Sequence, residues 1–241
     1  MLCSLIRSHP QAICHGEVLA QEQPPVSGIY GRKLKGDPEF GRLVRQYRNE
    51  QPQRFLYDIV FDPQGHRCVG FKFKTDEAFQ PRFKAIREVI SADKDIKIIH
   101  LIRRNLIDQY VSHRVVEQTG LTFLRPSDDR PQLVPFRVDI DHFIAYVTDL
   151  KERQQAAHDL YRDHRSLVLA YEDIVAPQSS ALDDLQAFLG IDRRPLSTPL
   201  LKIIGNNSEM VLNLKEVRAA LAGKQSSTHN GQQAEARSLE V

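Results

Sequence analysis

One stretch of the chain combines an arginine, a hydroxyl and the expected start of a helix. Ile96–Ile102 is short, β-branched and nearly apolar, which is typical of a buried strand in a parallel sheet. Arg104 follows this strand, and Asn105–Gln118 then carries apolar residues at helical spacing. Helix N-termini favour anions, a guanidinium forms paired hydrogen bonds with phosphate, and Ser112 adds a hydroxyl donor. The pattern therefore predicts an anion site built from Arg104 and Ser112.

The same residues also have a purely structural interpretation. Asn105 is a good N-cap with Asp108 at the third helical position, and Arg104 would then be an ion-pair partner on the surface. The residue types alone do not decide between an anion site and a capped helix end.

Short apolar strands alternate with helical patterns along most of the chain. Further strands are expected at Ala12–Cys14, Arg67–Lys74 and Ser166–Tyr171. Helices are expected around them, at Met1–Ser8, Pro38–Tyr47 with Asp37 as N-cap, Phe55–Val60, Phe83–Ile90, Asp139–Asp163, Ala181–Leu189 ended by Gly190, and Leu214–Leu221. This alternation predicts an α/β fold, a parallel β-sheet flanked by helices, whose ligands bind at the carboxyl ends of the strands.

Length and composition favour one globular domain with a tail. The 241 residues are 41% hydrophobic and 27% charged, which is the balance of an ordinary globular protein. We expect a domain over 1–222 and a disordered tail over 223–241, which is rich in Gln, Ser and small residues. Two stretches, Gln21–Gly36 and Leu121–Val134, are expected to be loops that determine which substrate is bound.

Charge and cysteine content narrow the class of protein. Lys plus Arg total 33 and Asp plus Glu 31, so a net charge of +2 does not predict nucleic-acid binding. No stretch approaches the roughly twenty apolar residues of a membrane helix, and no signal peptide is evident. Three scattered cysteines predict neither a disulfide framework nor a zinc site, so we expect a cytoplasmic location without a metal cofactor.

The arginine stretch resembles a known family. Arg104-Asn105-x-x-Asp108-x-x-x-Ser112 at a strand-to-helix junction is similar to the 3′-phosphate-binding motif of sulfotransferases, which use 3′-phosphoadenosine 5′-phosphosulfate (PAPS). The resemblance implies that Arg104 and Ser112 hold the 3′-phosphate of the nucleotide.

Two more stretches resemble the same family, in its bacterial or carbohydrate-type branch. Leu167–Val175 is similar to a later strand with a Tyr-Glu-Asp ending, which implies that Tyr171 contacts the adenine; a half-buried aromatic without this role is the alternative. Met1–Glu17 is similar to the segment after the family's phosphate loop. The resemblance reaches to about Lys224 and implies a P-loop-NTPase-like sulfotransferase fold.

The chain departs from the family at its start. The family's phosphosulfate loop, an Arg-Ser-Gly-Ser-Thr-like turn, and the strand before it would precede Met1 and are absent from the sequence. The expectation is therefore an N-terminally truncated sulfotransferase domain that keeps the 3′-phosphate half of the nucleotide site and lacks most of the 5′ half.

Sulfuryl transfer needs a base for the acceptor hydroxyl and positive charge for the leaving phosphate. Glu17 follows a short expected strand, and the family uses a glutamate in a comparable place, which implies a base whose pKa is raised by partial burial. His15 is the rival base, because an imidazole titrates near neutrality. The family's lysine corresponds to Lys72, with Lys74 on the same face as the alternative. For each of these residues a solvated position is the structural alternative.

The resemblance implies transfer of a sulfuryl group from PAPS to a hydroxyl of a carbohydrate, glycolipid or similar acceptor. Two other functions remain open at this stage. One is a non-catalytic remnant that binds nucleotide 3′-phosphates weakly or serves only as an interaction module. The other is a truncated P-loop nucleotide kinase. The expected partners are a small molecule or glycan, with no nucleic acid, and the sequence does not indicate the oligomeric state.

Overall fold

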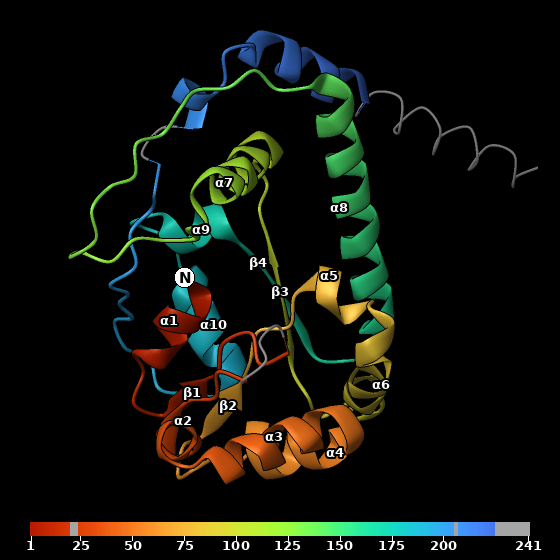
Figure 1. The fold of residues 1–241 in the computed structure, drawn as a ribbon, viewed down its shortest axis with the longest axis vertical. Coiled ribbons are helices and arrows are strands. Elements are labelled where there is room, and N and C mark those ends of the chain that lie inside the picture. Colours follow the sequence, from red (N-terminus) through yellow and green to blue (C-terminus); the bar gives the residue numbers. More distant parts are fainter. Residues whose placement is uncertain (20–23, 205–206, 225–241) are drawn as a thin grey trace, which may run out of the picture. The chain divides into compact units, whose positions relative to one another are not determined.

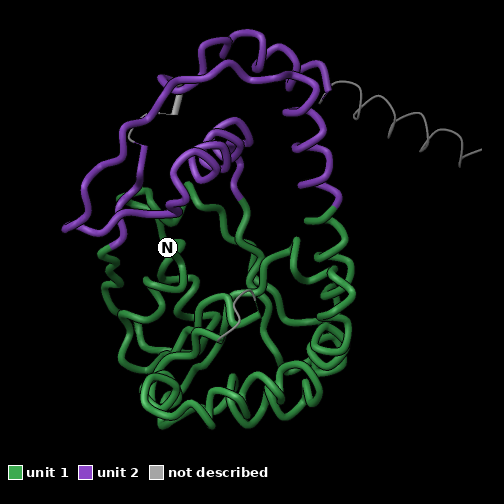
Figure 2. Tube along the Cα trace, in the orientation of Figure 1, with its two compact units in different colours: residues 1–102, 153–199 green, residues 103–152, 200–241 purple. Residues whose placement is uncertain are grey.

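The computed structural model describes residues 1–19, 24–204 and 207–224 of the chain (Figure 1). These residues form two compact units, each made of two chain segments (Figure 2). Unit 1 comprises Met1–Ile102 and Arg153–Pro199, and unit 2 comprises Arg103–Glu152 and the chain from Leu200 on. The chain thus passes from unit 1 to unit 2 directly after the apolar stretch that precedes the arginines.

Unit 1 contains four strands in two parallel pairs. Strand β1 (Ala12–Cys14) pairs with β2 (Cys68–Gly70), and β3 (Ile98–Ile102) pairs with β4 (Ser166–Ala170). Strands are present at all four predicted places, and both pairs are parallel as predicted. The pairs are not hydrogen-bonded to each other, so unit 1 has two small sheets where one continuous sheet was expected.

Helices of unit 1 surround these strands. Four of them, α1, α3, α6 and α10, match predicted helices closely, and the π-helix η1 covers the residues of the helix predicted over Phe55–Val60. Gly190 ends α10 in the left-handed conformation with φ 78°. The elements are α1 (Leu2–Arg7), α2 (Gly28–Gly36), α3 (Pro38–Glu50), α4 (Pro52–Arg54), the π-helix η1 (Phe55–Val60), α5 (Thr75–Ala78), the 3₁₀-helix η2 (Pro81–Phe83), α6 (Lys84–Ala92), α9 (Tyr171–Val175) and α10 (Ala181–Leu189).

Two hydrophobic cores pack against the strands of unit 1. We call core A the cluster of Phe40, Val44, Phe55, Leu56, Ile59, Val60, Phe83, Ile86 and Ile90, and core B the cluster of Leu5, Ile6, Ala12, Cys14, Leu169, Ile174, Leu185 and Ile191. Neighbouring residues of a strand point to opposite faces. Accordingly Ile98 packs against core A and Ile99 against core B, while Cys68 joins core B and Phe71 core A. Strand β3 therefore has side chains in both cores, and the segment that begins with β2 contacts core B through Cys68 and core A through Phe71.

The strand expected to be buried is only half-buried. Leu101 on β3 is 45% exposed and Val168 on β4 is 56% exposed. A central strand of a parallel sheet has a neighbour on both edges, whereas β3 pairs with β4 alone. Leu101 and Val168 point to opposite faces of this pair, so their exposure shows that the described residues do not fully cover either face.

Unit 2 is built on two helices. The first turns of α7 (Leu106–Thr119) pack with α8 (Ile140–Leu160, of which residues to Glu152 belong to this unit) through Tyr110, Val111, Phe143 and Val147. A 3₁₀-helix η3 (Asn207–Met210) and a helix over 214–224 complete the unit.

In unit 2 the structure agrees with the predicted loop, whereas the first two residues of the predicted tail are helical. The expected loop at 121–134 contains no helix or strand beyond the bridge of Leu124 to Leu201. Gly223 and Lys224, assigned to the tail, are the last described residues of a helix, and 225–241 lie outside the described residues. Among the helices that the structure describes, none has the length and apolar content required to span a lipid bilayer.

The start of α3 provides a first test of the fold. The Asp37 carboxylate oxygen Oδ1 accepts a hydrogen bond from the Phe40 amide at 2.9 Å, and Pro38 occupies the first helical position. We expect Asp37→Ala to lower the free energy of unfolding by about 1 kcal/mol, because the amide loses its partner. Urea denaturation measures the difference, and Asp37→Ser, which can cap as well, is the control. Equal stability of Asp37→Ala and the wild type would contradict the assigned cap.

Candidate functional site

The anion site predicted at the end of β3 involves Arg103 as well as the expected residues. Asn105 Oδ1 accepts a hydrogen bond from the Asp108 amide at 3.0 Å, so the predicted N-cap of α7 is present. The side chain that reaches Ser112 is that of Arg103, whose Nη1 donates to Ser112 Oγ at 2.9 Å. The sequence had paired Ser112 with Arg104, so Arg103 is the residue that this prediction missed.

The two arginines differ in burial and in contacts. The Arg103 side chain is 19% exposed, and its Nη2 lies 3.8 Å from Asp108 Oδ2, whereas Arg104 is exposed. Arg103 is therefore held between a hydroxyl and a carboxylate on the first two turns of α7. The Arg103 guanidinium and the Ser112 hydroxyl lie together on the first two turns of α7, and Arg104 is the next residue of the chain. Guanidinium and hydroxyl groups near a helix N-terminus can bind a phosphate group.

Tyr171 lies in unit 1, at the first position of α9. The strand was expected to include it, but β4 ends at Ala170, which pairs in register with Ile102. The tyrosine is half-buried. Tyr171 thus directly follows the last residue pair of the β3–β4 sheet, at its carboxyl edge.

A second site forms where β1 and β2 end. The Lys72 amide donates to the Gly16 carbonyl at 3.1 Å, so pairing continues past both strands and brings Glu17 and Lys72 together. Lys72 Nζ lies 2.5 Å from Glu17 Oε1, and Lys74 Nζ lies 3.0 Å from Glu17 Oε2. The sequence left Lys72 and Lys74 as alternatives, and both contact Glu17.

Lys74 extends this site to a residue that the sequence analysis did not select. Its Nζ also lies 3.0 Å from Oε1 of Glu77, whose side chain is only 6% exposed. Glu77 Oε2 is buried and has no hydrogen-bond partner among the described residues. Lys74 is the N-cap residue of α5, and its three-residue spacing from Glu77 was the available signal. Two carboxylates and two ammonium groups form one chain, Lys72–Glu17–Lys74–Glu77, with no net charge.

The electrostatics of Glu17 differ from the sequence prediction. Partial burial on its own raises the pKa of this carboxyl, but the hydrogen bonds from Lys72 and Lys74 outweigh it and hold the pKa below its ordinary value. The expected raised pKa is therefore wrong for the protein in this state. The pKa of Lys74 moves up, because Glu77 and Glu17 outweigh the opposing effect of burial. Glu17 and Lys74 are thus charged at neutral pH.

His15 has a structural position. The ring is fully buried, its Nε2 donates to the Val60 carbonyl at 2.9 Å, and its Nδ1 accepts from the Ser27 amide at 2.7 Å. Burial lowers the pKa of the imidazole to about 4. Both ring nitrogens are occupied by backbone groups, so the geometry does not support His15 as a base for a substrate.

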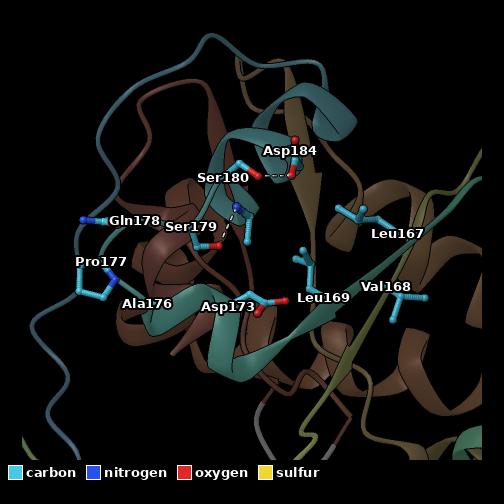
Figure 3. A pocket seen from close by; sticks show the side chains of 11 residues that line it. Leu167, Val168, Leu169, Asp173, Ala176, Pro177, Gln178, Ser179, Ser180 and Asp184 are labelled. Atoms are coloured by element: carbon cyan, nitrogen blue, oxygen red, sulfur yellow. Dashed lines mark hydrogen bonds between the residues drawn. The ribbon is translucent and has the colours of Figure 1, made fainter.

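A surface cavity of about 730 Å³ lies elsewhere in unit 1, along the outer edge of β4 (Figure 3). Leu167, Val168 and Leu169 line it on one side, and the segment from Ala176 to Ala181 lines it on another. Its lining does not include Glu17, Lys72 or Tyr171. The predicted site residues therefore do not converge on this cavity.

Two general searches complete the description. Within the described part of the chain, no group of three or more His, Cys, Asp or Glu side chains is arranged to hold a metal ion. Comparisons with protein-family models, with curated proteins and with solved structures found no match for this chain.

The buried imidazole makes stability depend on pH. The unfolded chain protonates His15 near its ordinary pKa of 6.5, whereas the folded protein resists protonation until about pH 4. Since the unfolded state binds the proton first, stability contributed by His15 is present above pH 6.5 and is lost as pH falls toward 4. The full difference corresponds to roughly 3 kcal/mol. We expect His15→Gln to flatten the pH profile of the free energy of unfolding over this range.

Urea denaturation at several pH values measures this effect. His66→Gln, at a partly exposed ring that contacts the Pro63 and Gln64 carbonyls, controls for the loss of an imidazole elsewhere. An unchanged profile in His15→Gln would show that His15 is accessible to protons in the folded protein, against the observed burial.

Proposed function

We propose that this chain is a PAPS-dependent sulfotransferase domain of the bacterial or carbohydrate-type branch, located in the cytoplasm. It would transfer a sulfuryl group to a hydroxyl of a carbohydrate, glycolipid or similar acceptor. The observation that carries the proposal is the arrangement at the start of α7, where Arg103 is hydrogen-bonded to Ser112 beside the capping Asn105. A guanidinium and a hydroxyl near a helix N-terminus are groups that can bind a phosphate, which supports the proposal.

The residues at the start of α7 fit a phosphate group. Ser112 Oγ accepts from Arg103, so its hydroxyl hydrogen can be donated to a phosphate oxygen. Arg104 is exposed and adds a second guanidinium. We propose that Arg104 contributes positive charge to the bound phosphate and that Arg103 orients Ser112, to which it donates a hydrogen bond. Tyr171 is the proposed contact for the adenine ring.

The strands support the proposed P-loop-NTPase-like fold. Both strand pairs are parallel and β3 has side chains in both core A and core B, as expected for a parallel sheet that is covered on both faces. We propose that the two pairs are parts of a single such sheet. The candidate site residues of unit 1 then all follow strand ends at its carboxyl edge, where ligands of open α/β sheets bind.

Glu17 is the proposed base and Lys72 its partner. When bound, PAPS supplies the sulfuryl group. Glu17 accepts the proton of the acceptor hydroxyl, and its 31% exposed side chain is accessible for this. Lys72, 48% exposed, can turn from Glu17 toward an anion. Each hydrogen bond that Glu17 loses moves its pKa up toward the range in which a carboxylate is an effective base.

A second candidate function is supported by the same cluster. Glu17 is hydrogen-bonded by two lysines and has a depressed pKa, which suits a binding module better than a general base. In this alternative the chain binds nucleotide 3′-phosphates without transferring a group. The two candidates share the nucleotide site and differ in the role of Glu17.

The first test concerns the nucleotide site. We expect adenosine 3′,5′-bisphosphate to raise the melting temperature of the chain and Arg104→Ala to weaken its binding roughly 10–100-fold, because a charge-assisted hydrogen bond is lost. Ser112→Ala removes a neutral donor, and we expect a smaller loss of about fivefold to tenfold. Thermal shift titrations give the dissociation constants.

Arg114→Ala is the matched control for these variants. Arg114 lies on the same helix and pairs with Glu117 at 2.5 Å, so its removal takes away the same charge at another position. If Arg114→Ala weakens binding as much as Arg104→Ala, the nucleotide is attracted by general positive charge and the assigned site is wrong.

The second test separates catalysis from binding. We expect Glu17→Gln to lower sulfuryl transfer roughly 10²–10⁴-fold while nucleotide binding persists, since the amide cannot accept the proton. Transfer is measured with radiolabelled PAPS and extracts of oligosaccharides and glycolipids. Glu39→Gln, at an 86% exposed side chain paired with Arg42, is the control. Nucleotide binding without transfer in the wild type would favour the second candidate function.

A further inference from the structure

The buried carboxylate of Glu77 lies at one end of the cluster Lys72–Glu17–Lys74–Glu77. Its side chain is 6% exposed, and its Oε1 lies 3.0 Å from Lys74 Nζ. The second oxygen, Oε2, is buried and has no hydrogen-bond partner among the described residues. A buried carboxylate oxygen without a partner is unusual, because it has lost its contact with water. Glu77 therefore contacts Lys74 with one oxygen and keeps a second acceptor in reserve.

The backbone of α5 fixes Glu77 beside Lys74. The Lys74 carbonyl accepts hydrogen bonds from the amides of Glu77 at 3.1 Å and of Ala78 at 2.8 Å. The Ala78 carbonyl accepts a further hydrogen bond from Arg87 Nη1 at 2.6 Å, which ties α5 to α6. A lysine side chain is flexible, so its ammonium needs a fixed partner to stay in one place. Glu77 is such a partner for Lys74.

The two lysines of the cluster are held differently. Lys74 Nζ lies 3.0 Å from an oxygen of Glu17 and 3.0 Å from an oxygen of Glu77, and its side chain is 34% exposed. Lys72 is 48% exposed, and Glu17 is its one carboxylate partner among the described residues. On the side of α1, Lys72 also interacts electrostatically with the Cys3 thiol and the amino group of Met1. Lys72 is thus free to leave Glu17 while Lys74 stays.

The proposed reaction changes the charge of this cluster. When Glu17 accepts a proton it becomes neutral, and Lys74 loses one of its two negative partners. A partly buried ammonium without a partner is costly, and this cost would oppose protonation of Glu17. Glu77 removes the cost, because Lys74 remains paired and Oε2 is available for a second hydrogen bond.

We propose that Glu77 is a positioning residue for Glu17: it anchors Lys74 and keeps this lysine paired when Glu17 accepts the proton of the acceptor hydroxyl. The inference rests on the proposed function, in which Glu17 is the base. In that step the O–H bond breaks, the proton moves to Glu17, and the hydroxyl oxygen keeps the electron pair for its bond to sulfur. The electron pair of the broken sulfur–oxygen bond leaves with the nucleotide phosphate. Glu77 exchanges no proton and touches no substrate.

Rates of lysine acetylation test the anchor without any activity. The folded full chain is labelled with a trace of acetic anhydride at pH 9, digested and analysed by mass spectrometry. Burial disfavours the Lys74 ammonium, but the hydrogen bonds to Glu77 and Glu17 outweigh it and raise the pKa of this lysine. In the wild type we therefore expect Lys72 to react at least about threefold faster than Lys74, which needs no variant.

Two variants separate the roles of the two carboxylates. We expect Glu77→Gln to speed acetylation of Lys74 at least about threefold and to change that of Lys72 less than about twofold. Glu17→Gln should speed acetylation of Lys72 more than that of Lys74, because Glu77 still holds Lys74. Lys84, which pairs with Glu88 on α6, is the internal reference in every sample.

The pH profile of sulfuryl transfer tests the role of Glu77 in catalysis. Without Glu77, Lys74 pairs with Glu17 alone and favours its charged form, so the pKa of Glu17 falls and Glu17 is a weaker base. We expect Glu77→Gln to lower kcat roughly threefold to tenfold and to move the acid limb of the profile to lower pH. Loss of folded protein lowers the rate without moving this limb.

Matched variants complete the experiment. Glu77→Asp retains a carboxylate, and we expect it to restore most of the rate. Glu88→Gln, at a 63% exposed side chain 3.7 Å from Lys84, is the control and should leave the rate and the acid limb unchanged.

The possible outcomes separate this inference from the proposed function. An unchanged acetylation rate of Lys74 in Glu77→Gln, or equal release of both lysines in Glu17→Gln, would refute the anchor. Transfer by Glu77→Gln with the wild-type rate and acid limb would overturn the positioning role and leave the proposed function standing. No transfer by the wild type would instead overturn the proposed function, and with it the role of Glu77 in catalysis.

Discussion

The parallel pairing of short apolar strands is the constraint on which the rest of unit 1 depends. Because successive residues alternate between two faces, β3 can supply both core A and core B only if helices cover both sides of the layer. Within each parallel pair, the carboxyl ends of the two strands then lie at the same edge. This pairing brings Lys72 Nζ within 2.5 Å of Glu17 Oε1, although the two residues are 55 positions apart in the sequence.

Charge balance distinguishes the two candidate sites. At the ends of β1 and β2, two lysines are matched by Glu17 and the buried Glu77, so this cluster is neutral and internally satisfied apart from one oxygen of Glu77. At the start of α7, Arg103 lies between the Ser112 hydroxyl and the Asp108 carboxylate, and Arg104 is exposed. The first site changes its electrostatics only when a ligand draws a lysine away from Glu17.

The sequence predicted helix ends well where a residue type is typical of a cap. Asn105 and Asp37 have the side chains of N-caps, and both cap the predicted helices. Gly190 ends α10 as expected. Helix α2 was not predicted, because three of its nine residues are glycines and glycine has a low helix propensity. Its place in unit 1 shows that tertiary packing overrides this weak propensity.

The site was harder to predict than the elements, since contacts between distant residues decide it. Arg103 and Arg104 are adjacent and chemically identical, and only the path of the backbone determines which of them reaches Ser112. His15 and Glu17 both follow β1, but one turns inward to Val60 and the other toward Lys72. Burial of Glu77 on a four-residue helix leaves almost no periodic signal. These features need the fold before they can be recognised.

The central claim is that the chain recognises a 3′-phosphate on a nucleotide. Isothermal titration calorimetry of the wild type with adenosine 3′,5′-bisphosphate and with adenosine 5′-monophosphate tests it most directly, because the two ligands differ only in that group. The account predicts a dissociation constant at least about tenfold lower for the bisphosphate, as expected for charge-assisted hydrogen bonds to one phosphate. Equal affinities, or no binding of either nucleotide, would contradict it.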